Sequence, residues 1–97
     1  MIRSFADSAT EDLFNGRDSR RARKACPRSL WAVVRPRLDQ LNRVLEVGEL
    51  RIPPGNRLER LRGDRAGQYS IRINQQYRVC SEWEDGYADQ VEVTDYH

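Results

Sequence analysis

The second half of the chain alternates apolar and polar residues, and this period of two limits the possible folds more than any other feature. The alternation runs through residues 69–73, resumes at residues 77–83 and appears again at 91–93. Such a pattern is typical of strands that bury one face. Asn74-Gln75 and Glu84-Asp85-Gly86 predict the turns between them. The pattern therefore predicts an antiparallel meander. Its buried face includes Tyr69, Ile71, Ile73, Tyr77 and Val79.

Residues 29–47 carry a different period, with apolar residues at steps of three and four that predict one buried helical stripe. The stripe consists of Leu30, Val34, Leu38, Leu41 and Leu45. Pro36 interrupts it, because proline lacks an amide donor and disfavours helix at Arg35. Two interpretations stay open: one bent helix, or a break followed by a helix that starts at Pro36. Gly48 is expected to end the element.

The N-terminal third predicts shorter elements. Ile2–Phe5 suits a first strand or a docking arm, and Ser8–Phe14 suits a helix capped by Asp7 or Ser8 and stopped by Gly16. The charge run Arg17–Lys24 predicts a solvated short helix or loop, with an RNA- or ribosome-facing patch as the alternative. The proline-rich segment 50–57 predicts a loop. Together the elements predict an α+β fold, with a short N-terminal strand and helices on one face of a mostly antiparallel sheet.

Length and composition limit the organisation and the class of protein. Ninety-seven residues predict a single domain over residues 1–97. No apolar run approaches the ~20 residues that a membrane span requires, and the acidic N-terminus does not resemble a signal peptide. We therefore expect a cytoplasmic protein that does not bind membranes. Cys26 and Cys80 lie far apart and predict buried thiols, so neither a metal site nor a cofactor is expected.

Arginine supplies nearly all of the positive charge, since Lys24 is the only lysine. Strand alternation places Arg72 and Arg78 on the sheet face opposite the helices. Three further arginines surround the predicted turn at Gly63-Asp64: Arg60, Arg62 and Arg65. Guanidinium groups bind phosphates with paired donors, so this face predicts an RNA-binding surface. An ordinary solvated sheet face is the alternative.

The chain closes on Asp95-Tyr96-His97, and His97 is its only histidine. A histidine exchanges protons near neutral pH and can act as a general acid or base. Strict alternation would send Asp95 and His97 toward the helices. Because such groups seldom enter a small core, we expect the chain to bend or leave the sheet after Thr94 and gather the three side chains at one rim.

Six segments, spread over nearly the whole chain, together resemble a known family. They are residues 1–5 (MIRSF), 50–58 (LRIPPGNRL), 61–65 (LRGDR), 67–74 (GQYSIRIN), 77–79 (YRV) and the terminal Asp95-Tyr96-His97. The chain resembles HigB-type toxins of the RelE superfamily, which belong to bacterial type II toxin–antitoxin modules. The resemblance implies a RelE-like fold and a ribosome-dependent endoribonuclease that cleaves mRNA by attack of a 2′-hydroxyl on the adjacent phosphate, without a metal ion.

The resemblance also implies roles for individual residues. His97 and Asp95 would transfer or position protons, and Tyr96 would stack on a base or bind the phosphate. Arg62 and Arg78 would stabilise the phosphorane. Position 62 is often lysine in this family, and arginine can act only as a charge and a donor. Some relatives place a histidine where this chain has Glu59, so Glu59 is a candidate base, with an ordinary exposed glutamate as the alternative.

The implied partners are mRNA, the ribosome and a helix-turn-helix antitoxin of the HigA type. An alternative function also accounts for the arginines: a non-catalytic RNA- or antitoxin-binding regulatory module derived from such a toxin. Wild-type protein that binds RNA with steep salt dependence but spares translation would favour that alternative.

Overall fold

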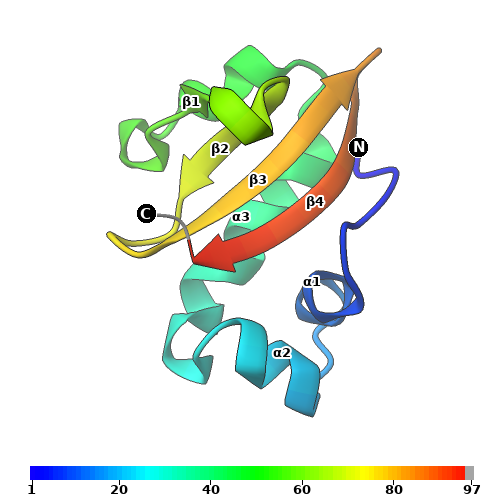
Figure 1. Ribbon diagram of the computed structural model, residues 1–97, viewed down its shortest axis with the longest axis vertical. Helices are drawn as coiled ribbons and strands as arrows, with labels where there is room; N and C mark the ends of the chain where they lie inside the picture. The colour runs from blue at the N-terminus through cyan, green and yellow to red at the C-terminus, as the bar shows by residue number, and fades with distance from the viewer. Residues whose placement is uncertain (96–97) are drawn as a thin grey trace.

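The computed structural model describes residues 1–95, which form helices packed against one antiparallel sheet in the order β1-β2-β3-β4 (Figure 1). The strands are β1 (Glu59–Arg60), β2 (Gln68–Arg72), β3 (Tyr77–Glu84) and β4 (Tyr87–Asp95). The α-helices are α1 (Ser8–Phe14), α2 (Arg20–Ala25) and α3 (Trp31–Arg43). Short 3-10 turns occupy Arg28–Leu30, Val47–Arg51, Pro54–Asn56 and Gly63–Arg65. The predicted α+β class and the meander are confirmed.

The two predicted turns join the strands of the meander. Asp85 and Gly86 both adopt positive φ, 51° and 83°, and connect β3 to β4 as a two-residue loop. This backbone geometry matches the twist of a hairpin and suits an Asp-Gly pair. Between β2 and β3, the Asn74 side-chain oxygen accepts from the amides of Gln76 (2.8 Å) and Tyr77 (2.7 Å). These bonds fix the register in which Arg72 lies opposite Arg78.

Residues 1–10 cover the outer edge of β4. Ile2 and Phe5 form isolated parallel bridges with Ala88 and Val91, so the predicted docking arm exists but is not a full strand. The buried Thr10 hydroxyl accepts a hydrogen bond from the amide of Val93 at 3.0 Å. An uncovered edge strand can pair with other chains. Here residues 1–10 supply hydrogen-bond partners for backbone groups along the β4 edge.

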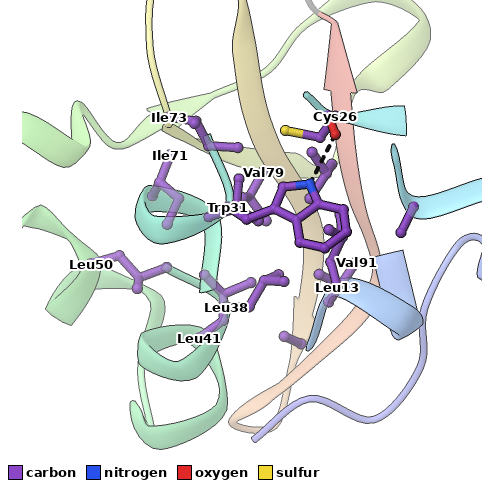
Figure 2. Close-up of a cluster of buried hydrophobic side chains, with 14 of the residues drawn as sticks. Leu13, Cys26, Trp31, Leu38, Leu41, Leu50, Ile71, Ile73, Val79 and Val91 are labelled. Atoms are coloured by element: carbon purple, nitrogen blue, oxygen red, sulfur yellow. Dashed lines mark hydrogen bonds between the residues drawn. The ribbon is translucent and has the colours of Figure 1, made fainter. Parts of the chain in front are cut away.

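The core lies between α3 and the sheet (Figure 2). Leu38 of α3 is fully buried, and Ile71 of β2 and Val79 of β3 are almost so. Burying one such side chain stabilises the fold by ~1.5–3 kcal/mol. The indole of Trp31 is buried too, and its Nε1 donates to the carbonyl oxygen of Cys26 at 2.9 Å, which fixes the start of α3.

Helix α3 decides between the two interpretations of Pro36. One continuous helix runs from Trp31 to Arg43 with Pro36 inside it. A proline there costs ~3 kcal/mol in an isolated helix. Val34 and Leu38, on either side of Pro36, are both buried in the core. Their packing offsets this cost and keeps the helix whole.

The predicted end of this helix is wrong. Helix α3 ends at Arg43 rather than near Gly48, and Val44 is already extended with ψ of 147°. Val44 is buried, whereas Leu45 is 73% exposed and does not belong to the buried stripe. Leu45 fits the three- and four-residue spacing only by coincidence. The backbone is extended from Val44 onward, and this turns the Leu45 side chain outward.

The charge run between α1 and α3 contains a real helix with a structural anchor. Asp12 is buried, and its carboxylate accepts from Arg21 Nε and from the Ser19 hydroxyl, each at 2.6 Å. The Arg21 and Ser19 hydrogen bonds lower the pKa of Asp12 to about 2, with Arg21 the largest cause. This contact ties α2 to α1. The predicted N-cap of α1 is Asp7, whose side chain accepts from the Thr10 amide at 2.7 Å.

Candidate active site

Arg78 is a predicted site residue whose side chain is largely buried. It is the second residue of β3 and lies between Arg72 on β2 and Thr94 on β4. Its neighbour Val79 faces the core, so alternation sends Arg78 to the opposite sheet face, as predicted. The prediction of an open face is wrong at this position, however, because only 14% of the Arg78 side chain is exposed.

The contacts of Arg78 fix its guanidinium group. One terminal nitrogen donates to the carbonyl oxygen of Arg57 at 2.8 Å, and the other lies 3.9 Å from a carboxylate oxygen of Glu59. Its Nε is buried and has no hydrogen-bond partner among the described residues. A buried donor left without an acceptor costs ~1–3 kcal/mol. The guanidinium is therefore held in place at the cost of one buried N–H without an acceptor.

A buried asparagine positions the loop that supplies the Arg57 carbonyl. Asn56 is fully buried, and its side-chain amide donates to Gln40 Oε1 at 2.9 Å and to the Leu50 carbonyl at 3.1 Å. The next residue, Arg57, has a positive φ of 47° that turns the chain into β1. The Pro-Pro-Gly-Asn sequence thus forms a fixed corner beside Arg78.

A surface pocket of about 390 Å³ opens around this arginine and is called here the Arg78 pocket. It is lined by Arg57, Leu58, Glu59, Arg72, Asn74, Gln75 and Arg78. The structure thus brings three predicted residues together: Arg72, Arg78 and Glu59. The lining contains three guanidinium groups and one carboxylate, which is 58% exposed. A pocket of this charge favours an anion over a cation or a neutral ligand.

Arg60 and Arg62 lie beside this pocket rather than in it. With Glu59 and Leu61 they line a second recess of about 380 Å³. Glu59 is common to both linings. Arg60 and Arg62 are both exposed. The two groups of arginines are therefore adjacent along β1 and do not form one cluster around a single point.

Arg65 has a different environment from the other arginines. Its guanidinium donates to Gln68 Oε1 at 3.0 Å and pairs with Glu92 at 3.1 Å. Beneath it, Cys80 is fully buried on the sheet face opposite the core. Burial raises the pKa of the Cys80 thiol, and it raises that of Cys26 to about 11. Both cysteines are free and buried, as predicted, and neither has the character of a nucleophile.

The end of β4 places one residue of the predicted terminal triplet. Strand β4 continues through Asp95, which lies opposite Tyr77, so the predicted departure from the sheet after Thr94 is wrong. Asp95 shares the strand parity of the buried Val93, and its carboxylate accepts from Gln76 Nε2 at 2.9 Å. The structure does not place Asp95 in the lining of the Arg78 pocket. Tyr96 and His97 lie outside the described residues.

Sequence reasoning missed four of the residues that line the pocket: Arg57, Leu58, Asn74 and Gln75. All four lie in loops, where no periodicity shows which way a side chain points. The available signal was their position, since each lies within a few residues of a predicted arginine. Within residues 1–95, no cluster of His, Cys, Asp and Glu could hold a metal ion. No helix in that range is long and apolar enough to cross a membrane.

Comparison with known proteins agrees with this architecture. A family model described as "RelE-like toxin of type II toxin-antitoxin system HigB" matches residues 3–97. Toxin HigB-1 of Vibrio cholerae is 39% identical over 88 residues, which cover 91% of this chain and 90% of that protein. An uncharacterized protein of Haemophilus influenzae is 36% identical over 59 residues, or 61% of this chain and 58% of its own.

A solved structure shares the fold at lower sequence similarity. A chain of the YoeB-YefM complex from Staphylococcus aureus superposes with a TM-score of 0.61 at 18% identity, over 100% of this chain and 98% of that chain. That similarity supports the arrangement of sheet and helices. The sequence matches extend over nearly the whole chain and give the family directly. This chain therefore belongs to the HigB-like family of RelE-like toxins of type II toxin–antitoxin systems.

Proposed function

We propose that this toxin is a ribosome-dependent endoribonuclease that blocks translation by cutting mRNA. In the proposed reaction the 2′-hydroxyl attacks the adjacent phosphate. The P–O5′ bond breaks and leaves a 2′,3′-cyclic phosphate and a 5′-hydroxyl. A base takes the proton of the 2′-hydroxyl and an acid gives one to the departing 5′-oxygen. Membership of the toxin family supports a role against the host cell.

The observation that carries the proposal is the position of the Arg78 guanidinium in the wall of an arginine-lined pocket. Its side chain is 14% exposed, and its bond to the Arg57 carbonyl holds it there. An RNA phosphate in the pocket would pair with this guanidinium and neutralise a poorly solvated cation. A preorganised donor directed at developing negative charge typically contributes ~3–4 kcal/mol to lowering a barrier.

The surrounding arginines suit a polyanion better than a single small anion. Arg57 and Arg72 line the same pocket as Arg78, and Arg60 and Arg62 continue the positive charge along β1. Successive phosphates of one RNA strand would contact this row while one of them occupies the pocket. Arg65, already paired with Glu92, would contribute mainly to the local field.

Proton transfer is assigned to the C-terminal residues and to Glu59. Asp95 adjoins Thr94, which pairs with Arg78, so the last described residue of β4 is at the same end of the sheet as the pocket. In the proposal His97 and Asp95 transfer or position protons, and Tyr96 stacks on a base or binds the phosphate. Glu59, exposed and 3.9 Å from Arg78, is the candidate base within the pocket.

Side chains alone perform this chemistry in the proposal, without a metal ion or cofactor. Its ribosomal target places the toxin in the cytoplasm. The solved structure that shares this fold is a chain of the YoeB-YefM complex, in which two proteins are bound together. For this chain we propose a helix-turn-helix antitoxin of the HigA type as that partner.

The test is controlled expression in bacteria without the antitoxin, with mapping of new 5′ ends on translated mRNA. Wild-type protein should arrest growth and cut mRNA. Arg78→Ala should slow cleavage about 10²–10³-fold, and His97→Ala or an added C-terminal tag should also weaken it.

Arg43→Ala, which alters an exposed residue at the end of α3, is the matched control and should act like wild type. Undiminished cleavage by Arg78→Ala and His97→Ala would refute the site. A harmless wild-type protein that still binds RNA would favour the non-catalytic module.

A further inference from the structure

Large exposed apolar side chains gather at one place on the described surface. Among residues 1–95 the exposed large hydrophobics are Met1, Leu45, Ile52 and Tyr87. All but Ile52 line one recess of about 510 Å³, together with Glu46, Asp85 and Gly86. These six residues are called here the apolar patch. Scattered exposed apolar residues are ordinary, whereas a contiguous group with a polar rim marks an interaction surface.

Backbone contacts hold the patch in place. The amino group of Met1 donates to the carbonyl oxygens of Val44 (3.3 Å) and Gly86 (3.2 Å), which joins the N-terminus to both neighbouring loops. The Glu49 carboxylate accepts from the amides of Leu45 and Glu46, each at 2.8 Å. Leu45 is therefore fixed in an outward position, 73% exposed, rather than displaced by a mobile loop.

The rim of the patch is acidic. Glu46 and Asp85 belong to the lining, and Glu84 is exposed beside them in the hairpin. Two cations lie beside them: the Met1 amino group, which donates to two carbonyl oxygens, and Arg3, whose guanidinium stacks 4.9 Å from the centroid of the Tyr87 ring. Arg3 is bound by the Asp89 carboxylate at 2.9 and 3.1 Å and also lies 3.9 Å from Glu84. The carboxylates of Glu46 and Asp85 outnumber the Met1 amino group in the lining, so the rim keeps an excess of negative charge and complements a basic partner.

We propose that the apolar patch is a docking site for the antitoxin, filled by a segment that presents apolar side chains flanked by Arg or Lys. The chain belongs to a toxin–antitoxin family, so an antitoxin is the partner that such a surface serves. The proposal rests on that membership and does not depend on RNA cleavage. A second copy of the chain fits poorly. In a two-fold contact the same patch meets itself, and the rims formed by Glu46 and Asp85 would repel each other.

The patch is also separate from the Arg78 pocket. Tyr87 begins β4 and Asp95 ends it, so the patch and the pocket lie toward opposite ends of the sheet (Figure 1). Nine residues of extended chain span roughly 27 Å. Substitutions in the patch should therefore leave the arginine pocket unchanged, and binding can be tested apart from activity.

The experiment measures the affinity of the isolated antitoxin for purified wild-type and variant chains by calorimetry. The antitoxin is first obtained by co-purification with a C-terminally tagged chain from its native host. Leu45→Glu should raise the Kd about 30-fold or more, because it removes the most exposed apolar side chain of the patch and adds like charge to the rim. Glu46→Lys should raise it less. Ile52→Glu is the matched control, since Ile52 has the same 73% exposure outside the patch, and it should stay within about twofold of wild type.

Three outcomes would overturn the proposal. Leu45→Glu could bind as tightly as wild type, or Ile52→Glu could weaken binding as much as Leu45→Glu does. Sedimentation could also show a wild-type dimer that Leu45→Glu converts to monomer with unchanged affinity for the antitoxin, which would assign the patch to self-association. Equal melting temperatures of the variants check the fold. Growth arrest by Leu45→Glu in bacteria without antitoxin measures toxicity independently of antitoxin binding. Failure of the docking proposal is therefore distinguishable from failure of the ribonuclease proposal.

Discussion

At the scale of single residues, Arg78 combines a structural role with a proposed functional one. Its side chain is largely buried, and one terminal nitrogen fastens the Arg57 carbonyl at the corner before β1. The other terminal nitrogen lies 3.9 Å from a Glu59 carboxylate oxygen, and the residue lines the pocket. Only a guanidinium has enough donors, in a planar arrangement, to bind both the protein and a phosphate. Arg62 has no such constraint because it is exposed at the rim.

This difference predicts opposite tolerance of lysine at the two positions. Arg78→Lys keeps the charge but loses the planar set of donors, so mRNA cleavage on translating ribosomes in vitro should slow at least about tenfold. Arg62→Lys keeps the exposed positive charge, which is the contribution expected of this residue, so the cleavage rate should stay within about threefold of wild type. Equal rates for the two variants would show that Arg78 acts as a point charge only.

The same residues show what sequence reasoning can reach. The side of the sheet on which Arg72 and Arg78 lie follows from alternation with Ile71 and Val79, and the structure confirms it. The burial of Arg78 does not follow, because it depends on the loop at Arg57, far away in the sequence. Loop residues carry no periodic signal, so most of the pocket wall could be found only in three dimensions.

At the scale of elements, burial decides where the predicted pattern holds. The stripe of α3 was found from its spacing, and packing of that stripe keeps the helix continuous through Pro36. The spacing continued to Leu45 although the backbone had already become extended at Val44. Pattern alone cannot detect such an end, because no glycine or cap marks it. The exposed Leu45 that results belongs to the apolar patch.

The junction of α1 and α2 leads to a prediction about acid stability. The pKa of Asp12 is about 2 in the folded protein because Arg21 and Ser19 bind the carboxylate, whereas an unfolded aspartate titrates near 4. A depressed pKa stabilises the fold above about pH 4, and this contribution is lost as the pH falls from about 4 through about 2. Asp12→Asn should therefore have a lower urea midpoint than wild type at pH 6, and the gap should narrow toward pH 2.

The control for this titration is Asp39→Asn, which alters an exposed aspartate of α3. Its urea midpoint should follow that of the wild type across the same pH range. A gap between wild type and Asp12→Asn that stays constant from pH 6 to pH 2 would contradict the role assigned to the Asp12 carboxylate.

At the scale of the whole molecule, β4 connects every part of the proposed function. Its first residue, Tyr87, belongs to the apolar patch, and its last residues lie next to Arg78 and lead to the terminal triplet. The strand is an edge strand, and residues 1–10 cover it through contacts that cross almost the full length of the chain. The N-terminal residues therefore stabilise the C-terminal strand.

The Thr10–Val93 hydrogen bond allows this coupling to be tested. Thr10→Val preserves the shape of the buried side chain but leaves the Val93 amide without its acceptor, so the free energy of unfolding should fall by ~1–3 kcal/mol. Thr10→Ser retains the hydroxyl, so it should lose less stability than Thr10→Val does.

Chemical denaturation measures the stability of both variants. Amide hydrogen exchange at Val93 gives the local readout, and it should accelerate more than exchange at Val79, on the neighbouring strand. If Thr10→Val slows mRNA cleavage while the protein stays folded, the N-terminal helix supports the strand that leads to the proposed catalytic residues. Unchanged exchange at Val93 would instead show that this bond does not secure the edge.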